Sequence, residues 1–383
     1  MSVIIKEVES RDALKAFVRF PNELYKGIPQ YVPPIERDEL NILSVQKNPG
    51  LKNCQVKYWL AYKDGKIAGR MAGIINNEFI EKWAKRYARF GWVDFIDDED
   101  VSRILFETAE KWAISNGMDA INGPLGFTDF DPEGIMIEGF DELATIIERY
   151  NHPYYATHIE KMGYKKDADW FEYQLNIPAA LPENIKRVSK YVLKKHKLRV
   201  VRIKKLTEIE KFADGVFKLL NDLYGLMYGF VPITPELKNF YIRKYLPLID
   251  PKLMAFIVDE KDTLVAFGVT MPSYSELFKQ AKGSWLRLLW LKFTGQAVKT
   301  DTVDMYFIGV LPEYINHGLS SVLINTVGQT LIDLGYKKAE TNIEFESNEA
   351  VQSLWKHFDY RQHKRRRCYL KSFISSSRTE DNI

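Results

Sequence analysis

The same order of secondary-structure patterns occurs twice along this chain of 383 residues, and this repetition constrains its fold most strongly. Residues 58–75 and 253–270 each read as two strands joined by a polar turn, which is Asp-Gly in the first case. A further strand, a helix ending in glycine and another strand then follow in both halves, at 90–96, 101–117 and 118–125 and at 303–310, 319–335 and 336–345. The pattern predicts an α/β protein with mixed sheets, built from two domains of one fold.

The join between the halves is predicted as a basic amphipathic helix at 179–198, with Ile185, Val188 and Val192 on one side. Residues 186–205 contain no Asp or Glu, so this run is either a solvated connecting helix or a surface that attracts phosphates or an acidic membrane. The predicted N-terminal domain is 1–178 and the C-terminal domain is 199–371. The polar tail at 372–383 is predicted to be disordered.

Composition restricts the class of protein. The net charge of +3 is too small to indicate a nucleic-acid binder. The two cysteines, Cys54 and Cys368, are expected to be free thiols, and no Cys/His spacing predicts a metal site. The N-terminus resembles neither a signal peptide nor a transit peptide, so we expect a cytoplasmic protein. The most apolar stretch, at 285–293, is about half the length needed to cross a bilayer.

The stretch "GVLPEYINHGLSSV" at 309–322 joins a strand to a helix through a turn with one glycine. Such a turn leaves backbone N–H groups directed into the gap, at the positive end of the helix dipole, which suits a pyrophosphate. By itself, a glycine before a helix is also typical of a plain turn. The residues that would line the anion site are Asn316, His317, Gly318, Leu319, Ser320 and Ser321.

The order of elements and this turn resemble the GCN5-related N-acyltransferase (GNAT) superfamily. The loop resembles the family's Val-x-Pro-x-Tyr-Arg-x-x-Gly-x-Gly motif, which wraps the pyrophosphate of acyl-coenzyme A. Matching positions are Val310, Pro312, Tyr314 and Gly318. Ile315 stands where the family has Arg or Gln, and Ser320 where it has a second small residue.

A second motif, at 348–360, resembles Asn-x-x-Ala-x-x-Leu-Tyr-x-x-x-Gly-Phe. Asn348, Leu354 and Tyr360 are in register, but Trp355 replaces the tyrosine that protonates the leaving thiolate in many members. The resemblance implies acyl-coenzyme A as a co-substrate, with no tightly bound cofactor. It also implies a polarising backbone N–H on the fourth strand, between Ile308 and Val310.

The first half resembles the same fold without the phosphate loop. Its helix begins with Asp97, Asp98, Glu99 and Asp100, which favour a helix start but would repel a pyrophosphate. Its dense motifs, "INGPLGFTDFDPEGIMIEGFD" and "YNHPYYATHIEKMGYKK", resemble a group of bacterial tandem GNAT-like proteins. Some members of this group are ceramide-synthase-like N-acyltransferases, which implies a long-chain amine as acceptor.

Amine acylation needs a polarised thioester and a route for a proton to leave the amine. Glu344 is the candidate base in the second half. In the first half, His152, Tyr154 and Tyr155 are concentrated around Pro153, which restrains the backbone. They are candidates for proton transfer, although tyrosines in a turn are also often wedged between core and water.

Large apolar residues interrupt the second half at 273–297, among them Trp285 and Trp290. One interpretation is packing against the partner domain. The other is that this segment forms a lip, an exposed apolar surface that receives an apolar substrate or contacts the inner face of a membrane. Nearby Lys and Arg residues would then contact lipid headgroups. The second interpretation favours a long acyl chain.

The leading hypothesis is therefore an acyl-CoA-dependent N-acyltransferase that acts on an amine, with a lipid or sphingoid-type amine as a candidate acceptor. A small-amine or protein N-acetyltransferase is the alternative among enzymes. A non-catalytic acyl-CoA or lipid-binding module is the alternative from another class, because Trp355 and Ile315 depart from the family pattern. A nucleic-acid partner is not expected, because no aromatic platform accompanies the basic run at 186–205.

Overall fold

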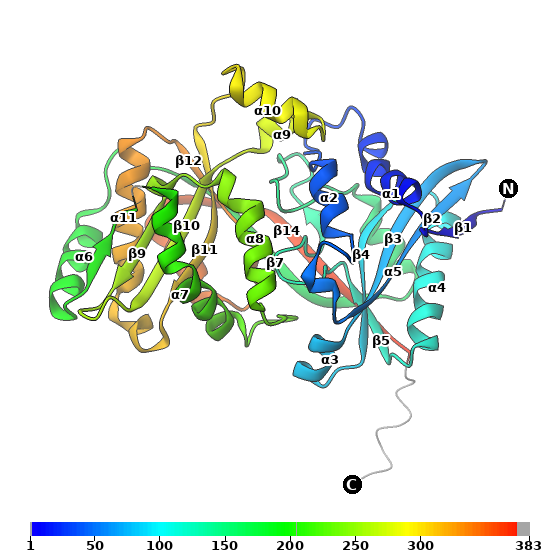
Figure 1. The fold of residues 1–383 in the computed structure, drawn as a ribbon, viewed down its shortest axis with the longest axis horizontal. Helices are drawn as coiled ribbons and strands as arrows, with labels where there is room; N and C mark the ends of the chain where they lie inside the picture. Colours follow the sequence, from blue (N-terminus) through cyan, green and yellow to red (C-terminus); the bar gives the residue numbers. More distant parts are fainter. Residues whose placement is uncertain (1, 204, 374–383) are drawn as a thin grey trace, which may run out of the picture. The chain divides into compact units, whose positions relative to one another are not determined.

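The computed structural model describes residues 2–203 and 205–373 (Figure 1). Their contacts divide the chain into two compact units. Unit 1 contains the described residues of 1–170, 275–298 and 364–383, and unit 2 contains 171–274 and 299–363. The chain passes from one unit to the other within two of its strands, β7 (Lys165–Asn176) and β14 (Asp359–Ser372).

Unit 1 is built on a mixed sheet in the order β1-β2-β3-β4-β5-β14. Only β4 and β5 are parallel, and β6 pairs with β14. The strands are β1 (Ile4–Glu7), β2 (Cys54–Lys63), β3 (Lys66–Asn76), β4 (Tyr87–Phe95), β5 (Ala120–Gly123) and β6 (Ile135–Glu138). The helices are α1 (Arg11–Leu24), α2 (Glu36–Ile42), α3 (Asn77–Trp83), α4 (Glu99–Ser115), α5 (Tyr154–Lys161), α9 (Ser275–Ala281) and α10 (Trp285–Phe293).

Local sequence explains the start of this sheet. Asp64 and Gly65 both have positive φ angles, of 53° and 76°, which gives the tight turn predicted between β2 and β3. Asp98 caps α4 by accepting hydrogen bonds from the N–H groups of Asp100 and Val101, both at 3.1 Å. The apolar face of α4 then packs on the sheet and forms the core of unit 1 with the buried faces of β3 and β4.

Unit 2 repeats this arrangement in the order β7-β12-β11-β10-β9-β8, with β11 and β12 parallel and β13 paired with β7. The strands are β8 (Arg199–Val201), β9 (Met254–Val258), β10 (Leu264–Pro272), β11 (Thr302–Val310), β12 (Lys338–Thr341) and β13 (Glu344–Phe345). The helices are α6 (Glu183–Lys195), α7 (Leu206–Tyr224), α8 (Pro235–Tyr245), α11 (Leu319–Asp333) and α12 (Glu349–Gln352). The predicted α/β class with a mixed sheet is confirmed.

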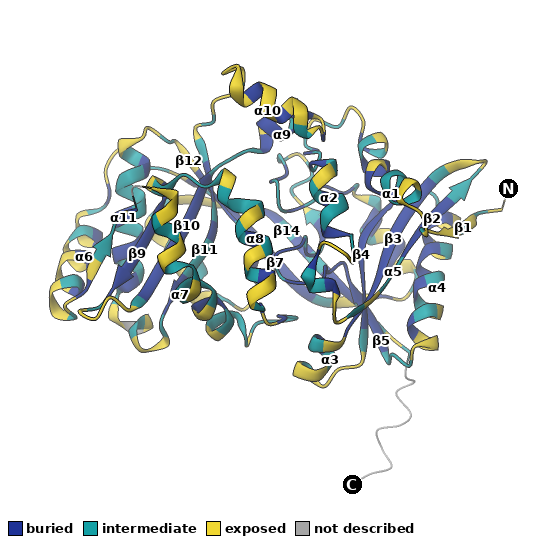
Figure 2. Cartoon of the chain, in the orientation of Figure 1, coloured by how far each residue is buried: buried dark blue, intermediate teal, exposed yellow. Residues whose placement is uncertain are grey.

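The predicted connecting helix is α6, and it packs on α11. Ile185 and Val192 are buried on one side, while Val188 remains partly exposed. The cores of unit 2 lie along β9, β10 and α11 and along β7, β11 and α11. Figure 2 shows the buried residues concentrated along the strands and the exposed ones on the outer faces of the helices.

The residue ranges of the two units differ from those of the predicted domains. Residues 275–298 and the last part of β14 belong to unit 1, although the sequence assigned both to the C-terminal domain at 199–371. Most of the predicted tail, from 374 to 383, lies outside the described residues. Among the described helices, none is both long and apolar enough to cross a bilayer.

Candidate functional site

In each unit, the pairing of the two parallel strands ends partway along the longer strand, where the shorter strand ends. β11 pairs with β12 only over Thr302–Met305, while its pairing with β10 continues to Val310. β4 pairs with β5 only over Tyr87–Arg89, while its pairing with β3 continues to Phe95. Of the described strands, none covers the side of residues 306–310 that faces away from β10. The predicted polarising positions, Ile308 and Val310, lie in this opening.

The predicted phosphate loop follows the opening in unit 2. A 3₁₀ turn at Pro312–His317 leads to Gly318, which has a φ angle of 81° and directly precedes α11. Gly318 has no side chain that could cap the helix. In the first turn, the Ser321 N–H group donates a 3.0 Å hydrogen bond to the Gly318 carbonyl group, whereas the N–H groups of Leu319 and Ser320 have no partner within the helix. Leu319 is buried, and Ser320 and Ser321 are partly exposed. Asn316 lies in the 3₁₀ turn, but its side chain is outside the described part of the chain.

The C-terminal half of α6 packs against this loop. A Cβ atom added to Gly318 would lie 3.2 Å from Val192 Cγ2 and 3.3 Å from Val188 Cγ1, so the glycine allows the helix to approach the loop. The imidazole rings of His317 and His196 stack with their centroids 4.8 Å apart. Desolvation, His317 and Lys195 all lower the pKa of His196. The side of α6 that carries Val188 and Val192, with His196 just after the helix, therefore adjoins the place where the phosphates are predicted to bind.

Glu344 is buried on β13, beyond the end of β12. Its Oε1 atom accepts a 2.8 Å hydrogen bond from Trp355 Nε1, and its Oε2 atom is buried without a hydrogen-bond partner among the described residues. Burial raises the pKa of Glu344 to about 8, although hydrogen bonds from Trp355 and Thr341 act in the opposite direction. A carboxyl group with this pKa can accept a proton near neutral pH and release it again.

Two predicted residues have structural roles in unit 2. The Asn348 side chain caps α12 by accepting a 3.4 Å hydrogen bond from the Val351 N–H group. Trp355 belongs to a buried apolar cluster, and its indole N–H group is used by Glu344. The predicted contact of Asn348 with the cofactor stays a prediction.

The candidates of the first half lie in and beside the core of unit 1. Tyr155 is completely buried and stacks on Phe95, with ring centroids 4.2 Å apart. Its hydroxyl oxygen accepts a 2.9 Å hydrogen bond from the Phe95 N–H group and lies 2.8 Å from the Tyr25 hydroxyl. Tyr154 donates a 2.6 Å hydrogen bond to the Phe95 carbonyl group, and the half-buried His152 ring stacks on Tyr154. Desolvation lowers the pKa of His152.

Because of this position, the Tyr155→Phe variant is expected to be less stable than the parent. Removing the hydroxyl leaves the buried Phe95 N–H group without its acceptor, so the free energy of unfolding is expected to fall by about 1–3 kcal/mol. Denaturant unfolding measures this change, with Tyr154→Phe at a less buried position as the comparison. A variant as stable as the parent would contradict the hydrogen-bond network. The predicted role in catalysis then requires that turnover falls further than the loss of folded protein explains.

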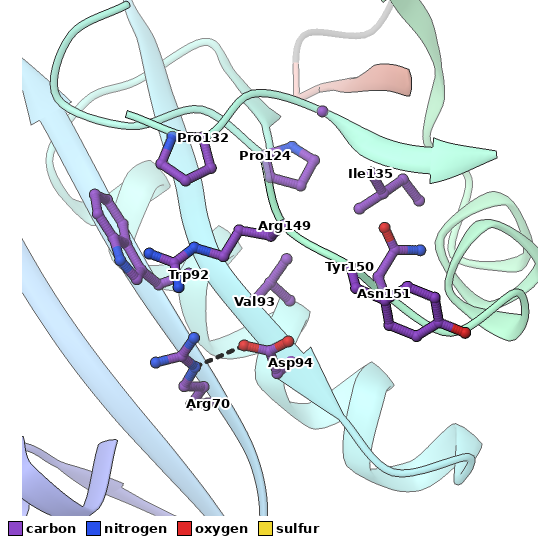
Figure 3. A pocket seen from close by; sticks show the side chains of 11 residues that line it. Arg70, Trp92, Val93, Asp94, Pro124, Pro132, Ile135, Arg149, Tyr150 and Asn151 are labelled. Carbon is purple, nitrogen blue, oxygen red and sulfur yellow. Dashed lines mark hydrogen bonds and ion pairs between the residues drawn. The ribbon is translucent and has the colours of Figure 1, made fainter. Parts of the chain in front are cut away.

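The network continues from Tyr155 to a pocket in unit 1 of about 40 Å³ (Figure 3). Tyr25 donates a 2.6 Å hydrogen bond to Asp94, which also accepts a 2.7 Å hydrogen bond from Arg70 Nε. Arg149 lines the same pocket and forms a 2.7 Å ion pair with Glu39. Figure 3 shows Arg70, Arg149 and Asp94 grouped beside Trp92. Because the charges are paired, the pocket suits a small polar group without net charge.

The dense N-terminal motifs converge on this pocket. Pro124, Pro132 and Gly134 from the first motif and Tyr150 and Asn151 from the second all line it. Sequence reasoning identified the motifs but missed Arg70, Asp94 and Arg149. Arg70 and Asp94 could have been noticed as charged residues within β3 and β4, which are otherwise mainly apolar.

One further cluster in unit 2 has the residue types of a metal site. Ligand atoms of Glu172, Glu340 and His363 lie within 4.8 Å of one another, and all three residues are buried. His363 Nε2 lies 3.1 Å from Glu340 Oε1, and each residue also interacts with other protein groups. We therefore assign no ion to this cluster.

The two lip residues have different environments on α10. Trp285 is partly buried beneath the Arg37 guanidinium group, whose carbon atom lies 4.1 Å from the ring centroid. Trp290 is 52% exposed. The segment therefore packs on unit 1 through one side and exposes the other.

Comparisons with known proteins extend over the whole chain. No family model matches it. "Protein YghO" of Escherichia coli K12 is 29% identical over 381 residues, which cover 96% of this chain and 95% of that protein. "Bacterial ceramide synthase" of Caulobacter vibrioides is 25% identical over 378 residues, covering 95% of this chain and 96% of that protein. A tandem GNAT protein from the clavulanic acid biosynthesis pathway matches in structure with a TM-score of 0.57 at 11% identity, covering 98% of this chain and 100% of that one.

Proposed function

Because this chain has the tandem GNAT fold, we propose that it is an acyl-CoA-dependent N-acyltransferase that transfers a long acyl chain to an amine. The difference between the two units carries this proposal. In unit 2, an opening between parallel strands, an uncapped helix start at Gly318 and the buried Glu344 occur within residues 302–344. In unit 1, the corresponding helix start is occupied by the Asp98 carboxylate.

In the proposed reaction, the thioester carbonyl lies against the edge of β11 that is not paired with β12, where an N–H group between Ile308 and Val310 polarises it. The amine nitrogen attacks the carbonyl carbon, an N–C bond forms, and the C–S bond breaks. Glu344 takes the ammonium proton directly or through water. The indole of Trp355 is no acid at neutral pH, so the thiolate takes its proton from Glu344 or from solvent.

Two observations favour a long-chain amine as the acceptor. One full-length relative carries the name bacterial ceramide synthase. In addition, α10 exposes large apolar side chains.

A competition experiment tests the acceptor class. The purified protein is incubated with palmitoyl-CoA and equal amounts of a long-chain amino alcohol, a polyamine and a lysine-containing peptide. Mass spectrometry is expected to detect the acylated amino alcohol as the main product. A main product on the polyamine or the peptide would instead support the alternative of a small-amine or protein acyltransferase.

A non-catalytic acyl-CoA-binding module is the second candidate, and it is favoured by Trp355 at the position of the family's acid. The same mixture separates it from the enzyme. Bound palmitoyl-CoA that stays intact, with no acylated product, would select the binding module.

A further inference from the structure

The helix α10 exposes one continuous apolar face. Leu288 and Leu291 are buried, and the helix packs on α9. On the other side, four apolar residues follow the i, i+3, i+4, i+7 spacing of one helix face. They are Leu286, Leu289, Trp290 and Phe293, which are 78%, 45%, 52% and 93% exposed. Figure 2 shows much of α10 coloured as exposed.

The exposed face belongs to a well-anchored helix. Ser284 caps α10 by accepting a 3.3 Å hydrogen bond from the Arg287 N–H group. The Gly283 carbonyl group, just before the helix, accepts a 2.9 Å hydrogen bond from the Glu36 N–H group of α2. After the helix, the Ala297 N–H group donates to the Leu291 carbonyl group at 3.1 Å. The four apolar side chains are therefore held outward by a fixed scaffold.

The charged residues within α10 and next to it in sequence are cations. Residues 277–300 contain five Lys or Arg residues and no Asp or Glu. Arg287 and Lys292 lie within α10, and Lys282 and Lys299 flank it, all of them exposed. Apolar side chains beside cations are typical of a helix that lies at the interface of an anionic bilayer. A two-fold contact between copies would instead bring two segments of the same positive charge together.

We propose that α10 is a membrane-docking surface that inserts Leu286, Leu289, Trp290 and Phe293 among lipid headgroups, while the neighbouring cations contact anionic lipids. This surface would bring the protein to the phase in which a long-chain amine resides. The proposal does not depend on the proposed activity, because docking needs neither acyl-CoA nor an acceptor.

Vesicle flotation of the full chain tests the proposal. The vesicles contain phosphatidylcholine with or without about 30% phosphatidylglycerol, in about 0.1 M salt. The parent is expected to float with the anionic vesicles. The triple variant Leu286→Ser/Trp290→Ser/Phe293→Ser is expected to bind them at least about tenfold more weakly. Arg287→Gln/Lys299→Gln is expected to lose roughly fivefold per charge, and this loss shrinks as salt rises.

Ile114→Ser is the matched control, because Ile114 is 54% exposed on α4 of the same unit. It is expected to float like the parent, and thermal unfolding shows whether each variant remains folded. A parent that does not float, or a folded triple variant that floats as well as the parent, overturns the proposal. So does a parent that forms a dimer but binds no vesicles, with the triple variant monomeric, because α10 would then be a contact between copies.

Discussion

Replacing Ser320 with aspartate is expected to weaken palmitoyl-CoA binding by at least about a hundredfold while the protein stays as stable as the parent or becomes slightly more stable. Ser320 lies in the first turn of α11, two residues after Gly318. A carboxylate at this point interacts favourably with the helix dipole, but it repels a pyrophosphate bound at the same N–H groups. Asp98 occupies the corresponding helix start in unit 1 and caps α4.

Binding is measured by calorimetry, and stability by denaturant unfolding. The control is Asn325→Asp, which adds the same charge in the middle of α11. If both variants lose the same affinity, the effect is one of net charge and no anion site exists at Gly318. If Ser320→Asp binds palmitoyl-CoA as tightly as the parent, the phosphate loop is assigned to the wrong place.

The Glu344→Gln variant is expected to lower kcat by about 10²–10⁴-fold with little change in palmitoyl-CoA affinity. Because burial raises the pKa of Glu344 to about 8, roughly a tenth of these carboxyl groups are ionised at pH 7. The parent rate is therefore expected to rise with pH and level off above about pH 8, and the residual rate of the variant is expected to lack this rise. A parent rate that is constant from about pH 6 to 9 would remove Glu344 from the role of base.

The raised pKa of Glu344 also predicts the direction in which the free energy of unfolding changes with pH. The folded-state pKa of Glu344 is raised, so the folded chain keeps a proton that the unfolded chain has already released. The parent's free energy of unfolding must then fall as pH rises from the ordinary carboxyl pKa to about 8. Glu344→Gln removes this term, so the variant should gain stability relative to the parent over that range. Denaturant unfolding at about pH 5 and 8 measures the difference.

Trp355→Phe separates two effects on the pKa of Glu344, that of the Trp355 hydrogen bond and that of burial. It removes the 2.8 Å hydrogen bond that favours the charged form of Glu344. The midpoint of the pH–rate profile is therefore expected to move upward. A midpoint that moves downward would contradict the assignment of this titration to Glu344.

The fold was predictable because the local signals agree with one another. Asp64 and Gly65 define one turn, and apolar residues at helical spacing define α4 and α11. The sequence left open whether the insert at 275–298 packs against the partner domain or forms an exposed surface, because its apolar pattern fits both, and the contacts of the fold assign it to unit 1. Likewise, the sequence of β14 gives no sign that the strand runs from unit 2 into unit 1.

The candidate site could be proposed from the sequence only where its residues lie close together in the chain. The loop at Gly318 and the base candidate Glu344 lie 26 residues apart (344 − 318) and could be found through motifs. The network of Arg70, Asp94, Tyr25 and Tyr155 joins residues separated by up to 130 positions, and only the fold brings them together. Tyr155 was singled out as a candidate, but the burial of its hydroxyl depends on side chains from distant elements.

Release of thiol coupled to formation of an amide tests the central claim most directly. Purified protein is incubated with palmitoyl-CoA and a long-chain amino alcohol, and both free coenzyme A and N-palmitoyl product are quantified by mass spectrometry over time. The account predicts equal amounts of the two, with both falling together in Glu344→Gln and in Ser320→Asp. Palmitoyl-CoA that binds but remains intact, or thiol release without amide, would contradict an N-acyltransferase.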